Sequence, residues 1–328
     1  MDRQNVLVPG AGGAAGIGAI KSLRLANFQG KIVATDSDKL SAGLYLADNG
    51  YVVPPADSPS FLQEVMKIIK EEQIDIILPT SGFDIIPYSR NKKILESENV
   101  IAAMSDYEVI DTCLNKQSFY HKLRSTFSLP YTTRDPDQMN TFPCIAKPIR
   151  GKGSRNIFTC YNKKELEEIL SKHNDLIIQE YLPGKEYTID VLSDLTGTAL
   201  VAILRERIEI RAGISVKGKI VLHKAMQEEC LQVAEFLGIR GPSCIQMKCD
   251  REGVPRIIEV NPRLGGGTIL TAYAGVNFPE LIVKIANAEK IEISKPREIT
   301  MIRYYEEVIL SEKGEMLAIA SKNQRGAI

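Results

Sequence analysis

The stretch from Ser243 to Arg263 reads SCIQMKCDREGVPRIIEVNPR, and its pattern predicts a β-hairpin. Two apolar runs, CIQMKC and RIIEVN, flank a polar turn that contains glycine and proline, which is typical of two paired strands. A register symmetrical about that turn puts Cys249 opposite Arg256 and Gln246 opposite Glu259. Opposed side chains in a hairpin have Cβ atoms about 5 Å apart. The sequence therefore predicts that Gln246 and Glu259 lie close together.

The same hairpin predicts a magnesium site. Side chains alternate along a strand, so Glu259 and Asn261 share one face while Ile258 and Val260 face the core. Gln246 completes a set of three oxygen-bearing side chains that has only one formal negative charge. Mg²⁺ binds through a few protein oxygens and keeps positions for water and substrate phosphates. The alternative is an ordinary polar outer face of a hairpin.

The composition is that of a globular protein rather than a nucleic-acid or membrane binder. The 328 residues are 44% hydrophobic and 25% charged, with 41 basic and 41 acidic side chains and a net charge of zero. This length favours two or three structural units. Six cysteines without a CxxC pair favour reduced, mostly buried thiols. No apolar run approaches the roughly 20 residues of a membrane span, and the N-terminus does not read as a signal peptide, so we expect a cytoplasmic protein.

The N-terminal third and the rest of the chain differ in pattern. NVLVPG, KIVATDSD and IDIILPTSG read as strands, and AAGIGAIKSLRLAN and SFLQEVMKIIKEEQ read as helices between them. Strands that alternate with helices predict a parallel, doubly wound, Rossmann-like α/β sheet for residues 1–108. After residue 108 the helices and strands follow a mixed α+β order, which predicts a separate architecture.

The glycines from Gly10 to Gly18 follow the first strand, and Asp36 ends the second. This arrangement allows an NAD(P) site, with phosphate at the helix N-terminus and Asp36 on the ribose. The spacing is G-x-G-x-x-x-G, however, and a tight strand-to-helix turn needs glycine without any ligand. An NAD(P)-dependent oxidoreductase is therefore kept as an alternative.

Two further segments have features of nucleotide binding. In CIAKPIRGKGSRN, Lys147 ends a strand and a glycine-rich loop follows, which can fold over phosphates although it is not a Walker A loop. In IIQEYLPGKEYTIDV, the extended segment 179–182 can offer backbone groups to an adenine edge, and Glu186 can accept hydrogen bonds from ribose hydroxyls. An ordinary hairpin turn with incidental basic residues is the alternative for the first of these segments.

From about Asn115 to Gly275 the chain resembles an ATP-grasp domain, most of all the carbamoyl-phosphate-synthase large-subunit type of carboxylate–amine ligase. The resemblance rests on NKQSF, AKP, RGKGSRN, QEYLPGKEYTID, Gln246 and EVNPR, in that order. The glycine-rich front resembles the domain that precedes ATP-grasp in these enzymes. The implied organisation is a Rossmann-like pre-ATP-grasp domain at 1–108, a small lobe with linker helices and the glycine-rich loop at 109–182, and a large lobe with the metal site at 183–328.

The resemblance also implies roles for individual residues and a set of cofactors. ATP and Mg²⁺ are the implied cofactors, with Mn²⁺ as an alternative metal. Asn261 and Arg263 are implied at the transferred phosphoryl group, and the metal ligands are Gln246, Glu259 and Asn261. The implied nucleotide-binding residues are Lys116, Lys147, Gly151, Gly153, Ser154, Glu180, Tyr181, Leu182, Glu186 and Gln246.

The segment AILRERIEIRAG departs from the family pattern and adds a cluster of arginines. Alternation along a strand puts Arg205, Arg207, Glu209 and Arg211 on one face. Guanidinium groups bind carboxylate and phosphate in a bidentate manner, so we predict a catalytic role for Arg205 and Arg207 on an anionic substrate or an acyl phosphate. A solvated strand face is the alternative.

The predicted function is an ADP-forming ligase that activates a carboxylate as an acyl phosphate for attack by an amine. The expected partners are these two small molecules, without nucleic acid or membrane, and a homodimer is allowed for. Carbamoyl phosphate formation with partner subunits and nucleotide binding without turnover stay open beside the oxidoreductase. We expect the Gly10–Gly16 loop and the PTSGFD loop (Pro79–Asp84) to line the acceptor pocket, because ligands bind at the carboxyl ends of parallel strands.

Overall fold

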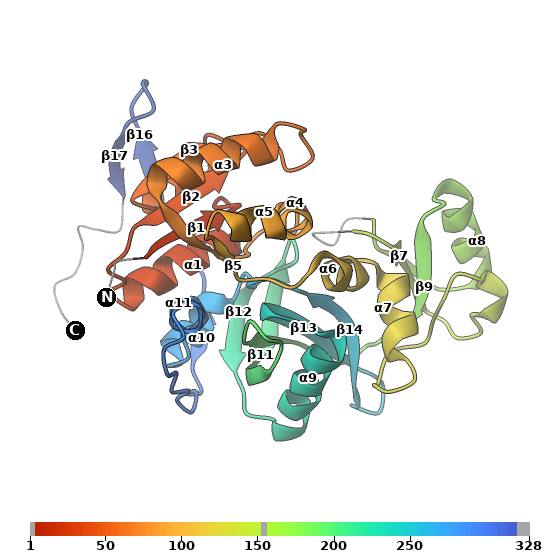
Figure 1. Cartoon of the computed structure of the whole chain (residues 1–328). Helices are drawn as coiled ribbons and strands as arrows, with labels where there is room; N and C mark the ends of the chain where they lie inside the picture. Colours follow the sequence, from red (N-terminus) through yellow and green to blue (C-terminus); the bar gives the residue numbers. More distant parts are fainter. Residues whose placement is uncertain (1–3, 152–155, 320–328) are drawn as a thin grey trace.

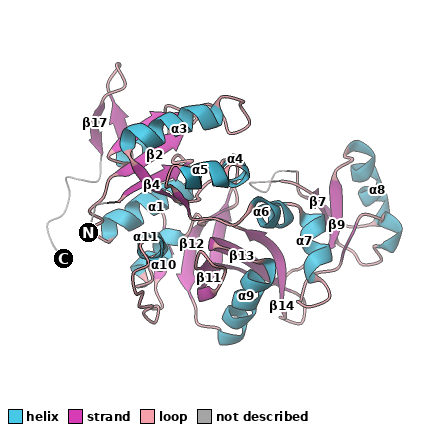
Figure 2. Cartoon of the chain, in the orientation of Figure 1, coloured by secondary structure: helices cyan, strands magenta, loops and turns pink. Residues whose placement is uncertain are grey.

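The computed structural model describes residues 4–151 and 156–319, which form three main sheets and a small C-terminal hairpin (Figures 1 and 2). Of the predicted nucleotide-binding residues, Gly153 and Ser154 lie outside the described residues. Within the described ranges, no helix has the length and apolar content that crossing a membrane requires. All six cysteines are free and five of them are buried, as the sequence predicted.

The first sheet is parallel, with the strand order β3-β2-β1-β4-β5, as expected for a doubly wound fold. Its amphipathic helices follow the predicted periodicity, whereas the short strands β3 and β5 were not predicted. The strands are β1 (Asn5–Pro9), β2 (Ile32–Asp36), β3 (Asn49–Val52), β4 (Ile74–Ile77) and β5 (Ile101–Ala102), and the helices are α1 (Ala14–Leu25), α2 (Gly43–Leu46), α3 (Phe61–Glu72), α4 (Ile85–Arg90) and α5 (Lys92–Ser97).

A four-stranded antiparallel sheet follows, with the order β6-β9-β7-β8. The glycine-rich segment lies between β7 and β8, and the linker helices implied by the resemblance are α6 and α7. The elements are α6 (Tyr107–Leu114), α7 (Lys116–Leu123), β6 (Thr132–Thr133), a 3₁₀ turn at Pro136–Gln138, β7 (Cys144–Pro148), β8 (Phe158–Cys160), α8 (Lys163–Lys172) and β9 (Leu176–Glu180).

The third sheet is antiparallel, has six strands in the order β14-β13-β10-β11-β12-β15 and is packed against α9. Residues 181–185 lead directly from β9 in the second sheet to β10 in the third. The elements are β10 (Glu186–Ser193), β11 (Ala199–Arg211), β12 (Ile214–Ile220), α9 (Lys224–Leu237), β13 (Gly241–Cys249), β14 (Pro255–Asn261), α10 (Thr268–Tyr273), α11 (Phe278–Ala286), β15 (Thr300–Ile302) and the hairpin β16 (Val308–Leu310) and β17 (Met316–Ile319).

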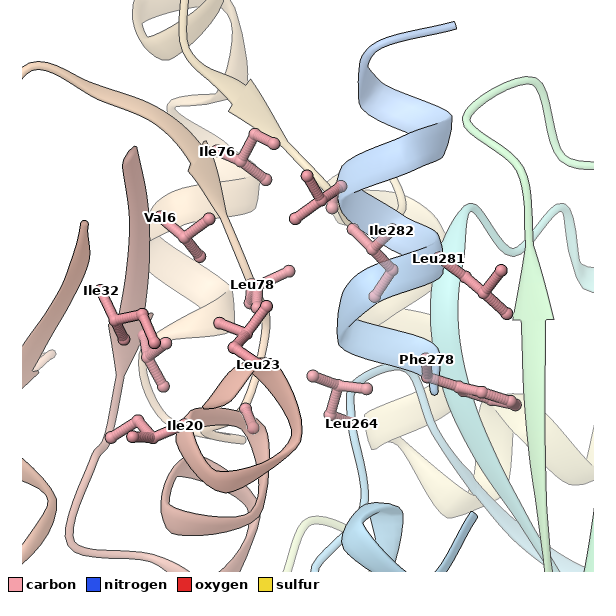
Figure 3. Packing of buried hydrophobic residues seen from close by; sticks show 14 of the residues in the cluster. Val6, Ile20, Leu23, Ile32, Ile76, Leu78, Leu264, Phe278, Leu281 and Ile282 are labelled. Atoms are coloured by element: carbon pink, nitrogen blue, oxygen red, sulfur yellow. The ribbon is translucent and has the colours of Figure 1, made fainter. Parts of the chain in front are cut away.

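The largest apolar core joins the two ends of the chain. Val6 and Ile76 of the first sheet pack in the same cluster as Leu264, Phe278 and Ile282 from the C-terminal part (Figure 3). Helix α11 lies beside α1, so the C-terminal part covers a face of the first sheet. This core holds the loops at the carboxyl ends of β1 and β4 against the third sheet. The domain boundaries after residues 108 and 182 remain predictions.

Candidate active site

The predicted hairpin is present as β13 and β14. Gln246 lies opposite Glu259, as predicted, but Lys248 and not Cys249 lies opposite Arg256. The register shifts by one residue between Gln246 and Met247 because a β-bulge lies in β14. The predicted symmetrical register is therefore wrong near the turn and right at the two residues proposed to share a metal.

The bulge also changes which residues of β14 face the core. Ile257 and Val260 are 0% and 1% exposed, whereas Ile258 is partly exposed, so the expectation that Ile258 faces the core is wrong. Asn261 Nδ2 donates to Glu259 Oε1 at 2.8 Å. Gln246, Glu259 and Asn261 therefore form one polar group on the side of the hairpin away from the α9 core.

Lys147 lies in β7 of the second sheet. It is 7% exposed, and its Nζ donates to Gln179 Oε1 at 2.7 Å. Burial lowers the pKa of Lys147 to about 8, while the carboxylates of Glu259 and Glu186 oppose the shift and Lys116 adds to it. Lys147 and Lys116 thus lie near each other and near the hairpin, which is the arrangement predicted for phosphate binding.

Lys116 is held in place by its own helix start. It is the first residue of α7, whose N-cap Asn115 accepts hydrogen bonds from two backbone N–H groups of the helix. The backbone N–H of Lys116 donates to Ile149 O at 3.0 Å. This bond ties α7 to the segment that leads into the glycine-rich loop, where Gly151 lies exposed.

The segment predicted to bind adenine is the link between the second and third sheets. Leu182 is 4% exposed, and Lys248 Nζ lies 5.6 Å from the centre of the Tyr181 ring. Glu180 at the end of β9 is bound to Tyr131, with its N–H donating to Tyr131 O at 2.9 Å and its Oε2 accepting from Tyr131 N at 3.2 Å. The side chain of Glu180 is thus hydrogen-bonded to the backbone just before β6.

Arg207 and Glu186 form an ion pair beside the hairpin. Arg207 Nη1 donates to Glu186 Oε1, and Arg207 Nη2 donates to Gly213 O at 2.7 Å. Glu186 was predicted to bind ribose and Arg207 to bind an anion. In the structure the two side chains are instead hydrogen-bonded to each other.

Arg205 forms a second, buried ion pair that the sequence did not predict. Its Nε and Nη2 donate to the two oxygens of Asp190 at 2.6 and 2.8 Å, and the two residues are 3% and 1% exposed. The signal available in the sequence was an aspartate within the apolar strand EYTIDVLS, since a buried carboxylate needs a cation. The pair fixes the guanidinium plane of Arg205.

The expectation of a single arginine face is wrong beyond Arg207. The β11–β12 register shifts between Arg207 and Glu209 and again between Glu209 and Ile210, so the alternation is interrupted. Arg211 is exposed and pairs with Glu209 at 2.7 Å. It therefore does not join Arg205 and Arg207.

The three glycines after the hairpin are closely packed. A Cβ at Gly267 would overlap the Arg205 guanidinium, and one at Gly265 would overlap Cys244 Sγ. Arg303 holds the other side of the loop, with Nη2 donating to Gly266 O and Nε to Ser215 O at 3.0 Å. The loop is thus fixed between two arginines.

A single cavity of about 1080 Å³ joins the third sheet to the first. Arg205, Arg207, Gln246, Asn261 and Arg263 line it together with the triglycine loop, the Gly10 turn and residues 80–84. This confirms that the Gly10 and PTSGFD loops share a pocket with the predicted phosphoryl site. Eight of the predicted site residues are not part of its lining: Lys116, Lys147, Gly151, Glu180, Tyr181, Leu182, Glu186 and Glu259.

The Gly10 turn is stabilised by a hydrogen bond within the first domain. Gly12 N–H donates to Asp36 Oδ2 at 2.8 Å, and the backbone at Gly10 has φ +58°, which favours glycine. Asp36 was expected to bind ribose if the chain bound NAD(P). Here one of its oxygens supports the glycine turn.

Two family descriptions match the chain. Residues 7–103 match "PylC-like, N-terminal domain", and residues 172–308 match "ATP-grasp in the biosynthetic pathway with Ter operon". These two matches support the ATP-grasp resemblance. The second match contains the whole β13–β14 hairpin with its bulge and triglycine loop.

Among curated proteins, the chain is similar to the carbamoyl phosphate synthase large chain of Methanobrevibacter smithii, with 26% identity over 304 residues. The match covers 83% of this chain but 28% of that relative, so the chain spans less than a third of its length. A second large chain, from Vibrio parahaemolyticus, is 28% identical over 333 residues and matches over 87% of this chain and 30% of its own.

Among solved structures, the fold is shared with the biotin carboxylase domain of Hydrogenobacter thermophilus 2-oxoglutarate carboxylase, in complex with MgADP, ADP and bicarbonate. The TM-score is 0.71 and the identity 18%, over 89% of this chain and 71% of that one. An L-amino acid ligase from Bacillus licheniformis has a TM-score of 0.65 and 17% identity, over 87% and 75%. The family matches and the curated relatives favour the ATP-grasp interpretation over the oxidoreductase, which leaves Lys147, Gln246, Glu259 and Asn261 without a role.

Proposed function

We propose that this ATP-grasp protein is an ATP-dependent, Mg²⁺-dependent, ADP-forming ligase that joins a carboxylate to an amine. The observation that supports this most is the single cavity that brings Gln246, Asn261 and Arg263 to the loops of the first sheet. A phosphoryl site and a substrate pocket that open into one another are what a carboxylate needs to be phosphorylated and then attacked. The family resemblance and the similar folds support the same activity.

The residues of the hairpin fit Mg²⁺. Glu259 supplies one carboxylate and Gln246 and Asn261 supply amide oxygens, whereas no group of three or more His, Cys, Asp or Glu that could hold a metal occurs among the described residues. A hard ion with oxygen ligands and retained water suits this set, and Mn²⁺ is the alternative. When bound, the metal would neutralise charge on the ATP phosphates. The biotin carboxylase neighbour is described with MgADP.

The nucleotide would lie between the second and third sheets. Lys147 and Lys116 are proposed to bind its phosphates together with Gly151, Gly153 and Ser154. Glu180, Tyr181 and Leu182 are proposed at the adenine edge, where the link between the sheets offers backbone groups. Glu186 is proposed at the ribose, and its ion pair with Arg207 keeps its carboxylate oriented.

The chemistry is a phosphoryl transfer followed by an acyl transfer. A carboxylate oxygen of the substrate attacks the γ-phosphorus, the bond to the β–γ bridging oxygen breaks, and ADP leaves. The amine nitrogen then attacks the acyl carbon, the C–O bond to phosphate breaks, and the nitrogen loses a proton as phosphate leaves. In this scheme Arg263 and Asn261 stabilise the transferred group, and Arg205 and Arg207 orient the carboxylate.

The proposal also includes a second candidate activity, a cellular location and an oligomeric state. Carbamoyl phosphate formation with partner subunits is the second candidate, because the curated relatives are carbamoyl phosphate synthase large chains. A homodimer is also proposed, since the biotin carboxylase neighbour is described as a dimer. A cytoplasmic location is proposed as well.

The test measures ADP formation with ATP and Mg²⁺ against carboxylates and amines offered in pairs. Glu259→Gln removes the proposed metal carboxylate, and Glu252→Gln is the matched control, because Glu252 lies exposed in the turn of the same hairpin. We expect substrate-dependent ADP formation that Glu259→Gln reduces at least 100-fold and Glu252→Gln leaves unchanged. Turnover by Glu259→Gln at the wild-type rate contradicts the metal site, and bicarbonate-dependent turnover favours the second candidate.

A further inference from the structure

The cavity described above has an apolar wall on the side of the first sheet. Two segments form this wall, the loop that follows β3 and the segment that leads into α4. Their apolar side chains line the same cavity as the hairpin of the third sheet. We define the apolar wall by six residues: Pro54, Pro55, Ala56, Phe83, Ile86 and Pro87.

The apolar wall presents surface that a ligand can cover. Phe83 is 64% exposed, and the other five residues are exposed or partly exposed. Ala56 and Ile86 pack against one buried cluster, which contains Val53 and Phe61, so the two segments of the wall lie together. Contiguous apolar surface that stays exposed often marks a ligand-binding groove, because covering it is favourable. The wall therefore suits a hydrocarbon group.

Further apolar side chains lie beside the triglycine loop, next to the proposed phosphoryl site. A Cβ at Gly266 would lie 3.3 Å from Ala14 Cβ and 4.0 Å from Ile214 Cγ2. Ala14 and Ile214 both line the cavity, and Ile214 is 39% exposed. Arg263 lies three positions before Gly266. A ligand held at Arg263 therefore also meets apolar side chains on the way to the first sheet.

The polar side chains at the end of α4 already have partners. The Arg90 guanidinium lies over the Tyr107 ring at 4.5 Å and donates to the Tyr107 hydroxyl at 2.7 Å. Asn91 Nδ2 donates to a backbone oxygen of α4 at 2.8 Å. Asp57 and Asp84 also line the cavity, and a carboxylate side chain does not bind a second carboxylate of a ligand. This side of the cavity thus disfavours a dicarboxylate.

The size of the cavity also favours a substrate with a bulky group. At about 1080 Å³ it is at the upper end of the roughly 300–1,000 Å³ of pockets that bind drug-sized ligands. The loop Gly265–Gly267 puts no side chain into this space. A transferred phosphoryl group and bicarbonate together would leave most of the volume empty.

We infer that the carboxylate substrate is a monocarboxylic acid with a bulky apolar group, which lies on the apolar wall while the carboxylate faces Asn261 and Arg263. The substrate role rests on the proposed function, whereas the preference for an apolar group rests on the cavity alone. Affinity then rises with the amount of hydrocarbon that the ligand buries. A charged group at the far end of the ligand opposes binding, and bicarbonate does not reach the wall.

The experiment measures binding to the full chain in the presence of MgADP by isothermal titration. The probes are butyrate, pentanoate, hexanoate and 3-phenylpropionate, with adipate and bicarbonate for comparison. From butyrate to hexanoate we expect the affinity to rise about fourfold per methylene group, which corresponds to about 0.8 kcal/mol for each. Adipate has the same chain length as hexanoate and should bind on the order of tenfold more weakly or worse, because a charge buried without a partner is costly.

Two variants and a matched control test whether the apolar wall is the binding surface. Ile86→Ala removes hydrocarbon from the wall, and Ala56→Asp adds a charge to it. Each should weaken hexanoate binding by at least fivefold, and Ile86→Ala should weaken butyrate binding less. Ile94→Ala is the control, because Ile94 is 46% exposed on the neighbouring α5 and lies outside the lining of the cavity. It should leave both affinities unchanged.

Product formation separates this inference from the proposed function. With ATP and hydroxylamine an activated acid yields a hydroxamate, because the hydroxylamine nitrogen attacks the acyl carbon, phosphate leaves and the nitrogen loses a proton. Binding that rises with chain length and depends on Ile86, without ADP or hydroxamate, supports the inference and contradicts the ligase. ADP formation with bicarbonate or adipate but with none of the apolar acids supports the ligase and overturns the inference.

The binding data alone can also overturn the inference. They do so if none of the apolar acids binds, if affinity does not rise with added methylene groups, or if Ile86→Ala and Ala56→Asp bind hexanoate as the wild type does. If one of the two variants does not fold, the other variant and the chain-length series decide.

Discussion

Lys147 of β7 is a buried lysine whose charge depends on its surroundings. Its side chain is buried, it donates to Gln179, and its pKa is lowered to about 8 chiefly by burial. The neighbouring Lys116 lowers the pKa further, and the carboxylates of Glu186 and Glu259 oppose both effects. Near neutral pH this lysine is charged in most molecules, but the charge is lost over a range that can be reached in solution.

ATP affinity should therefore fall as the pH rises from 7 to 9. Phosphate binds the charged form of Lys147, and the lowered pKa means that this form disappears as the pH passes through about 8. We expect Lys147→Met to weaken ATP binding at pH 7 by about 10-fold or more and to remove most of this pH dependence, since a charge-assisted hydrogen bond contributes roughly 1.5–3 kcal/mol.

Fluorescence titration with an ATP analogue at the two pH values checks this expectation. Lys163→Met is the matched control, because Lys163 lies on the surface of the same lobe and pairs with Asp137. An unchanged pH dependence in Lys147→Met would show that another group is responsible.

At the scale of the residue, strand alternation made the grouping of Gln246, Glu259 and Asn261 predictable. Glu259 and Asn261 are two apart on one strand, and the hairpin placed Gln246 opposite Glu259. Asp190 and Ser215 were not predicted, because each gains its place from the pairing of strands that the sequence does not reveal. Asp190 lies two strands from the hairpin edge and meets Arg205 across the β10–β11 pair.

At the scale of the element, the triglycine loop has no room for a larger residue, whereas helix α1 does. Gly267 has no room for a Cβ because Arg205 occupies the space, whereas a Cβ at Gly18 in α1 would make only ordinary contacts, at 3.8 Å or more. Gly267 is needed for packing against a charged side chain. Gly18 lies in a helix, where glycine lowers stability by about 1 kcal/mol relative to alanine.

Alanine at these two positions should therefore have opposite effects. We expect Gly267→Ala to lower the free energy of unfolding by about 1–3 kcal/mol, as other overpacked sites do, and to impair substrate binding by displacing Arg205. Gly18→Ala should raise the free energy of unfolding by about 0.5–1 kcal/mol. Urea unfolding of both variants beside the wild type measures this, and a stabilising Gly267→Ala would contradict the packing described here.

Helix α3 is tied to the first sheet by a buried carboxylate. Glu72 is 3% exposed and accepts hydrogen bonds from Lys31 at 2.6 Å, from Asn49 at 2.6 Å and from the Tyr51 hydroxyl. Burial raises the pKa of Glu72, but these donors together lower it more, so the net shift is downward. The hydrogen bond to Glu72 also raises the pKa of Tyr51 to about 12.

This network should make stability fall in acid. A carboxyl group with a lowered pKa in the folded state stabilises the protein above its unfolded pKa of about 4.3, and the effect is lost as the pH falls through the folded pKa. We expect Glu72→Gln to lower the free energy of unfolding by about 1–3 kcal/mol at pH 7 and by less at pH 3.5. Urea unfolding at both pH values tests this; an equal loss at both would show that the charge of Glu72 is not what matters.

The elements with strong periodicity were predictable and the irregular ones were not. The helices α1, α3, α8, α9 and α11 follow their apolar spacing, and β1, β2 and β4 follow their apolar runs. The bulge at Ile258 was not predicted, because it depends on the strand opposite. The short strands β3 and β5 have two to four residues, too few for a period to emerge.

At the scale of the whole molecule, the core between the chain ends sets the geometry of the cavity. Phe278 is 1% exposed and belongs to the same apolar cluster as Val6 and Ile76 of the first sheet (Figure 3). The sequence predicted three units in order along the chain. It did not predict that the C-terminal helices pack on the first sheet, because that contact joins residues more than two hundred positions apart.

Loss of Phe278 should therefore weaken the first sheet as well as α11. We expect Phe278→Ala to lower the free energy of unfolding by about 3–5 kcal/mol and to reduce the protection of the β1 amides against hydrogen exchange. Tyr305→Ala, at a side chain that is 89% exposed, is the control and should change neither. Loss of protection confined to α10 and α11 would show that the two ends are not one cooperative core.

The central claim is that the β13–β14 hairpin forms a magnesium–phosphoryl site, and nucleotide binding tests it without knowledge of the substrate. The measurement is the ATP affinity of the wild type, Glu259→Gln and Glu252→Gln, each with Mg²⁺ and with EDTA. We predict that Mg²⁺ strengthens binding at least tenfold in the wild type and Glu252→Gln but not in Glu259→Gln. Equal strengthening by Mg²⁺ in all three proteins would contradict the account.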